Sequence, residues 1–190
     1  MKSPAAAHIS TPPITLDEWL DSLPMSRVQV WVAVLCALAL FVDGYDIQVM
    51  ALAVPSLARG WSLPPSSFGL ALSAVVIGIS LGSGLLGPLG DRFGRRTLLA
   101  VTLAATSVAT FGTASARSPA EFVVWRLATG LALGAGIPSC AALTAEYSPA
   151  ANRSLALGLM NIASPIGAFS AGFIAPPVLA AIGWRGAFLV

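Results

Sequence analysis

The chain has 190 residues, of which 56% are hydrophobic and 9% are charged, and its formal net charge is +2. Soluble domains contain about 25% charged residues, so this composition excludes an ordinary water-soluble protein and indicates a lipid environment. The net charge is too small to indicate a nucleic-acid partner.

Residues 1–27 are predicted to form a cytoplasmic tail. They lack the apolar core of a cleavable signal peptide. The run Thr15-Leu16-Asp17-Glu18 has the spacing of a capping box. We therefore expect either a short amphipathic helix on the membrane surface or a partly ordered tail. His8, the only histidine, lies in this tail and is expected to have no chemical role.

Residues 28–190 are predicted to form one transmembrane domain, an all-α membrane protein. A spanning helix needs about 20 mostly apolar residues, and five stretches meet that requirement before a sixth begins. The predicted spans are residues 28–54, 68–89, 97–116, 121–144 and 155–182. Helix-breaking residues separate them: Pro64-Pro65, Gly94, Ser118-Pro119, Ser148-Pro149 and Gly183.

The distribution of positive charge predicts the orientation, because Lys and Arg are enriched in cytoplasmic loops. With the amino terminus inside, the inner side receives Lys2, Arg27, Arg92, Arg95, Arg96 and Arg153. The outer side receives Arg59, Arg117 and Arg185. This bias predicts a multi-pass protein of the cytoplasmic membrane with its amino terminus in the cytoplasm.

Two GxxxG steps predict close contact between helices. Gly78 and Gly82 form one in the second span, and Gly130 and Gly134 form another in the fourth. Small residues at this spacing let helix backbones approach closely in lipid. The steps are compatible both with helices that slide on one another and with static packing.

Three ionisable residues lie inside predicted spans, where each costs about 2.5–3.5 kcal/mol. Asp43 and Asp46 are three residues apart, so they project from nearly the same face of the first helix and are expected to line one cavity. Gly44 between them is expected to loosen the helix or admit another backbone. Two such carboxylates do not both ionise easily, so the pair suits uptake and release of a proton.

Arg126, in the fourth span, carries a permanent positive charge whose planar fork suits a carboxylate. It has three interpretations: it holds an anionic substrate, it neutralises Asp46, or it forms a pair that only orients helices. Glu146, at the inner end of the same span, is expected to pair with Arg92 or Arg95 rather than to contact substrate. No metal or cofactor is expected, and the two cysteines, Cys36 and Cys140, are interpreted as packing residues.

The loop after the second span places one acid among three arginines in a glycine-rich turn of minimal length. It resembles the signature loop between the second and third helices of the major facilitator superfamily. The residues that carry this resemblance are Gly87, Gly90, Asp91, Arg92, Gly94, Arg95 and Arg96.

Further motifs resemble the aromatic acid:proton symporters of that superfamily. They are Asp43-Gly44-Tyr45-Asp46, Arg126 followed by Gly130 and Gly134, Glu146-Tyr147-Ser148-Pro149, and the closing Gly183-Trp184-Arg185. The fifth span has Ala171 and Phe173 where the superfamily's antiporter signature has Gly and Pro, which favours symport.

The resemblance implies a carrier of two six-helix halves with alternating access, which takes up aromatic carboxylates such as hydroxybenzoates together with protons. Asp43 and Asp46 would serve proton coupling, and Arg126 the substrate or the charge network. Asp91, its neighbouring arginines and Glu146 would govern the conformational switch. Such carriers bind substrate between their halves, so this stretch alone is not expected to transport.

Other interpretations remain open from the sequence. A carrier for another organic anion or a sugar-like solute would share the loop motif. A membrane enzyme or a sensor is disfavoured, because the sequence has no nucleophile–base pair, metal-ligand cluster or soluble signalling domain. A non-functional truncated product is the remaining alternative.

Overall fold

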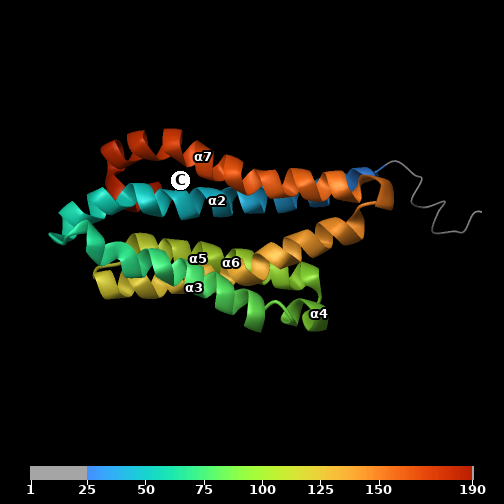
Figure 1. The fold of residues 1–190 in the computed structure, drawn as a ribbon, viewed down its shortest axis with the longest axis horizontal. Coiled ribbons are helices and arrows are strands. Elements are labelled where there is room, and N and C mark those ends of the chain that lie inside the picture. The colour runs from blue at the N-terminus through green and yellow to red at the C-terminus, as the bar shows by residue number, and fades with distance from the viewer. Residues whose placement is uncertain (1–24, 190) are drawn as a thin grey trace, which may run out of the picture.

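The computed structural model describes residues 25–189, which form helices and turns without any strand (Figure 1). Five of the helices are long and apolar enough to cross a membrane. The predicted all-α class and the number of spans are therefore confirmed. The expectations for the tail helix and His8 concern residues 1–24, which lie outside the described residues.

The helices run along the long axis of the bundle and reverse direction at its two ends (Figure 1). In chain order they are α2 (Arg27–Trp61), η1 (Pro65–Phe68), α3 (Gly69–Leu85), α4 (Leu89–Phe93), α5 (Arg95–Ser115), α6 (Pro119–Tyr147) and α7 (Ala150–Ala187). The predicted breakers lie at or beside the ends of these helices, except Gly183 near the end of α7.

Helix starts are set by local side-chain hydrogen bonds. Ser26 caps α2 through a reciprocal capping box, in which Ser26 N–H donates to Gln29 Oε1 over 2.7 Å and Gln29 N–H donates to Ser26 Oγ over 3.3 Å. Ser118 caps α6 by accepting from the Glu121 N–H over 3.2 Å. These bonds satisfy amide donors that the first helical turn leaves free.

Three predicted span boundaries were wrong. The first span continues beyond residue 54, through Pro55, to Trp61, and the fifth begins at Ala150 rather than at residue 155. A proline removes one backbone donor but is tolerated in a membrane helix whose other backbone bonds persist. The second span ends early, at Leu85, because a turn and then α4 follow.

The seam between α3 and α6 is built from the two GxxxG steps. A Cβ on Gly78 would lie 2.6 Å from the Leu127 carbonyl oxygen and 2.8 Å from Gly130 Cα, which leaves no room for a side chain. Cβ atoms on Gly82, Gly130 and Gly134 would likewise overlap carbonyl groups of the facing helix. The predicted close contact is confirmed.

Helices α2 and α7 also touch backbone to backbone, beside the acid pair. A Cβ on Gly44 would overlap the Ser164 carbonyl, and one on Gly167 would overlap the Phe41 carbonyl. The expectation that Gly44 admits another backbone is confirmed. Because Gly44 faces α7, Asp46 two residues later points away from α7, toward the rest of the bundle.

Five aromatic rings join the helix ends opposite α4. Neighbouring rings in this cluster have centroid separations of 5.4–6.1 Å, and the closest pair is Trp61 with Trp184. The members are Trp61, Phe68, Phe122, Trp184 and Phe188. Directly before Trp184, Gly183 adopts φ +74°, and the chain turns back there toward the middle of the bundle (Figure 1).

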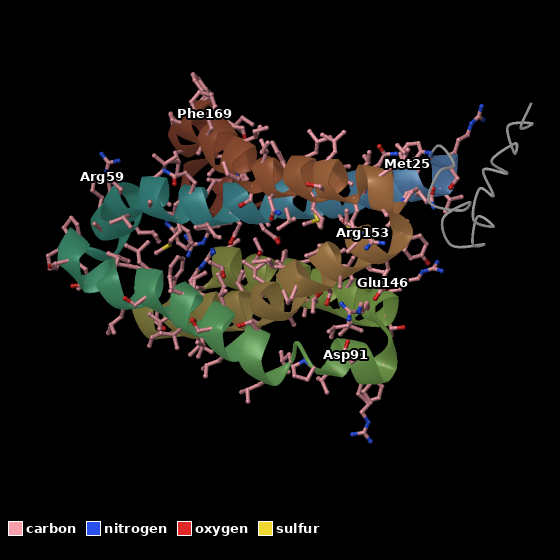
Figure 2. The ribbon with its side chains drawn as sticks, turned by 45° about the vertical axis from the view of Figure 1, so that its right-hand side comes forward. Met25, Arg59, Asp91, Glu146, Arg153 and Phe169 are labelled. Atoms are coloured by element: carbon pink, nitrogen blue, oxygen red, sulfur yellow. The ribbon has the colours of Figure 1, made fainter. Side chains whose placement is uncertain are left out.

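The outer surface of the bundle carries large apolar side chains. Phe169 is 71% exposed and Leu70 is 74% exposed. Figure 2 shows Phe169 pointing away from the helices. Such a surface suits contact with lipid tails, in agreement with the composition.

Candidate transport site and charge network

The centre of the candidate site is an ion pair between α2 and α6. The Arg126 side chain is fully buried, and its Nη1 donates to Asp46 Oδ1 over 3.2 Å. Its Nη2 donates to Asp46 Oδ2, so the contact uses both nitrogens of the fork and both carboxylate oxygens. Among the three interpretations of Arg126, the contact present in the structure is the ion pair with Asp46.

Besides Asp46, Arg126 lies against an aromatic ring, and part of its side chain has no polar partner among the described residues. The Phe188 ring lies against the guanidinium, with 5.2 Å between Arg126 Cζ and the ring centroid. Arg126 Nε is buried and has no hydrogen-bond partner within the described residues. The guanidinium is thus held between a carboxylate and an aromatic ring, and its Nε donor is left unused.

Asp43 is the unpaired acid of the site. It is 8% exposed, and in residues 25–189 it makes neither a hydrogen bond nor an ion pair. As expected, Asp43 and Asp46 line one cavity, which has a volume of about 170 Å³. The other lining residues are Phe41, Val42, Tyr45, Thr106, Thr110, Ile174, Ala187 and Phe188.

Sequence reasoning assigned no role to the other residues that line this cavity, and four of them carry hydroxyls or contact Arg126: Tyr45, Thr106, Thr110 and Phe188. Tyr45 lies between the two acids of the motif, and its buried hydroxyl has no partner in the described part of the chain. The threonines are four residues apart in the third span, a spacing that places both on one helix face. That spacing was a readable signal, whereas the return of Phe188 into the bundle depends on tertiary structure.

A second group of charged residues lies at one end of the bundle. Arg95 Nη2 is 3.0 Å from Asp91 Oδ1, and Arg95 Nε is 2.9 Å from Glu146 Oε1. These pairs tie α4, α5 and α6 together, and the expected partner of Glu146 is confirmed as Arg95. Figure 2 shows Asp91, Glu146 and Arg153 at this end and Arg59 at the other.

The loop that carries Asp91 is more ordered than the predicted minimal turn, because it contains the short helix α4. Gly94 ends α4 at φ +90°, a conformation that side chains with a Cβ rarely adopt. A Cβ on Gly87 would overlap the Ser83 carbonyl. Arg92 lies over the Phe93 ring, with 5.7 Å between Arg92 Cζ and the ring centroid. Neither Arg92 nor Arg96 forms an ion pair among the described residues.

The two cysteines are buried and free, and they pack with Leu40, Leu143 and Met160. This agrees with their interpretation as packing residues. Across residues 25–189 there is no group of three or more His, Cys, Asp or Glu side chains that could hold a metal ion.

Comparison with known proteins gives relatives with transporter names. The chain is 37% identical to a gallate transporter of Pseudomonas putida, over 93% of this chain and 39% of that protein. It is 34% identical to a 4-hydroxybenzoate transporter of Acinetobacter baylyi, over 90% of this chain and 37% of that protein. A niacin transporter of Acinetobacter baylyi is 31% identical, over 90% and 39% respectively. The chain thus spans about two fifths of the length of these relatives.

The family comparison covers most of the chain. Residues 36–190 match the model of the Major Facilitator Superfamily. This match and the relatives agree with the prediction of a transporter rather than an enzyme, and the five long apolar helices make the chain a multi-pass membrane protein. The chain therefore belongs to the Major Facilitator Superfamily.

Proposed function

We propose that this chain is the amino-terminal part of a secondary active transporter that takes up aromatic carboxylates together with protons across the cytoplasmic membrane. The observation that carries the proposal is the cavity in which Asp46 is paired with Arg126 while Asp43 is unpaired. The amino terminus is proposed to be cytoplasmic.

Proton coupling follows from the count of charges in the cavity. Arg126 neutralises one carboxylate, so the second one, Asp43, is buried without a positive partner. A charged side chain there costs free energy, and binding a proton removes that cost. Asp43 is therefore the group that takes up and releases a proton as the carrier changes state.

Recognition of an aromatic carboxylate follows from the surroundings of Arg126. Its fork suits a carboxylate, and the Phe188 ring already lies against the guanidinium. Protonation of Asp46 would free the fork for the substrate's carboxylate. The names of the gallate and 4-hydroxybenzoate transporters support this substrate class.

The conformational switch is assigned to the charge network at the end that carries α4. Its members are Gly87, Asp91, Arg92, Gly94, Arg95, Arg96 and Glu146. The exposed pairs of Arg95 are individually weak, so helix movement can break and re-form them at small cost. Because carriers of this kind bind substrate between two halves, this chain alone is proposed to be inactive.

The test is uptake of labelled 4-hydroxybenzoate and gallate by a full-length carrier that contains this chain, reconstituted in vesicles with an imposed pH gradient. Asp43→Asn is expected to abolish gradient-driven uptake and to leave membrane insertion intact. Glu121→Gln is the matched control, because it also converts an acid to an amide but lies exposed at a helix start.

Gradient-driven uptake by Asp43→Asn at the wild-type rate would refute the coupling role of Asp43. Uptake by the wild type that ignores the pH gradient would refute proton coupling itself. Transport of only another organic anion or a sugar-like solute would replace the proposed substrate class with the alternative.

A further inference from the structure

Two threonine hydroxyls of α5 face the acid pair without a hydrogen-bond partner. Thr106 and Thr110 are half-buried and line the cavity of Asp43, and in residues 25–189 neither hydroxyl makes a hydrogen bond. Four other hydroxyls of α5 donate within the helix, with bonds of 2.8–2.9 Å to carbonyls three or four residues earlier. These donors are Thr102, Ser107, Thr113 and Ser115.

The space beside these threonines is large and polar enough for water. The cavity of about 170 Å³ has room for several water molecules, and the buried Tyr45 hydroxyl also lacks a partner there. A second cavity of about 10 Å³, near the minimum for one water molecule, adjoins it. Asp43 and Thr106 line both cavities, so they lie at the junction between them.

On α5, the polar side chains that share a cavity with Asp43 are Thr102, Thr106 and Thr110, and the Thr102 hydroxyl is already bonded to the Leu99 carbonyl. The helix that carries Asp43 contributes Tyr45 and Asp46, and α6 contributes Cys140 and the paired Arg126. Neither α5 nor α7 contributes an ionisable side chain to the two cavities. A hydroxyl both donates and accepts hydrogen bonds, so a threonine can order water that carries a proton, whereas valine of the same shape cannot.

We propose that Thr106 and Thr110 hold water against Asp43 and form the route by which its proton enters and leaves. The inference rests on the proposed proton coupling and deepens it by naming residues of the proton route. A hydrated proton gives its proton to the Asp43 carboxylate and leaves water behind, and the reverse step restores both. The threonines act through water and Asp43, so they are positioning residues.

The experiment compares two modes of transport in vesicles that contain a full-length carrier with this chain. Gradient-driven uptake requires release of the proton on each cycle. Counterflow, the exchange of labelled for unlabelled substrate at equal pH, proceeds with the carrier protonated throughout. The variants are Thr106→Val with Thr110→Val, the same positions changed to Ser, and the control Ser107→Ala, whose hydroxyl is bound to the Leu103 carbonyl.

In the valine variants, the rate of gradient-driven uptake is expected to fall by about tenfold or more, because positioned proton-transfer groups are removed. Their rate of counterflow is expected to stay at the wild-type level. The serine variants are expected to restore uptake, and Ser107→Ala to behave as wild type. Wild-type uptake by the valine variants, or an equal loss in both modes, would overturn the inference. If the double variant fails to reach the membrane, each single valine variant is measured with the same criteria.

The two proposals fail in different ways. Uptake by the wild type without dependence on the pH gradient removes the proposed function and this inference together. A gradient-dependent wild type with unaffected valine variants removes only the role of the threonines.

Discussion

Removing either partner of the Asp46–Arg126 pair is expected to destabilise the protein, whereas removing both is expected to be far less damaging. Asp46→Asn leaves a fully buried guanidinium without a counter-charge. Arg126→Gln leaves two buried or nearly buried carboxylates in one cavity. Asp43→Asn is the matched control, because Asp43 makes no hydrogen bond or ion pair in residues 25–189.

The magnitude follows from the burial of the pair. Breaking a buried ion pair by removing one partner costs about 3–5 kcal/mol, because the other charge remains in a low dielectric. Replacing both charges by neutral groups often leaves stability nearly unchanged. A double-mutant cycle is therefore expected to give a coupling free energy of about 3 kcal/mol or more between Asp46 and Arg126.

The assay is thermal unfolding of a full-length carrier in detergent, and unfolding is monitored as the fraction of protein that remains monodisperse at each temperature. Asp46→Asn and Arg126→Gln are each expected to unfold several degrees below the wild type. The Asp46→Asn/Arg126→Gln double variant and the control Asp43→Asn are expected to unfold close to the wild-type temperature. Arg126→Lys is expected to fall between, because an ammonium cannot make the two parallel bonds of the fork. Additive effects of the two single variants would refute the argument that burial makes the charges interdependent.

Two more predictions concern helix packing and the charge network. Gly130→Val is expected to destabilise the protein by about 1–3 kcal/mol or more, because its Cβ would overlap the Val75 carbonyl. The measurement is the unfolding temperature, and the control is Gly158→Val, because a side chain at Gly158 would enter open space. Arg95→Gln is expected to slow transport while it costs about 1 kcal/mol or less in stability, because its ion pairs are exposed. Uptake rate and unfolding temperature are measured for Arg95→Gln, with Arg59→Gln at the opposite end of the bundle as the control. A wild-type uptake rate for Arg95→Gln would contradict this prediction.

Much of the fold was predictable because lipid restricts a chain to few solutions. Long apolar stretches must form helices there, so hydropathy predicted five spans correctly. Helix ends were harder, because proline does not end a membrane helix: the first span was predicted to end at residue 54, but α2 passes through Pro55 to Trp61. The GxxxG spacing predicted close contact, but it did not reveal which helices face each other.

The candidate site was partly predictable for a similar reason. A charge inside a span is costly and therefore conspicuous in the sequence, which singled out Asp43, Asp46 and Arg126. Sequence alone left open whether Arg126 holds a substrate, neutralises Asp46 or forms a pair that only orients helices, because the contact depends on the rotation of α6 against α2. Thr106 escaped notice because a threonine is common in helices and costs little in lipid.

The rotation of α2 explains why the two acids of one motif have different surroundings. Gly44 seats α2 against the Ser164 carbonyl, and this contact fixes which way the residues beside it point. Asp46 is then directed toward Arg126, while Asp43 is directed into the cavity with Thr106. A side chain at Gly44 would turn or displace α2 and so separate Asp46 from its partner. The glycine between the acids thus belongs to the charge arrangement as well as to the packing.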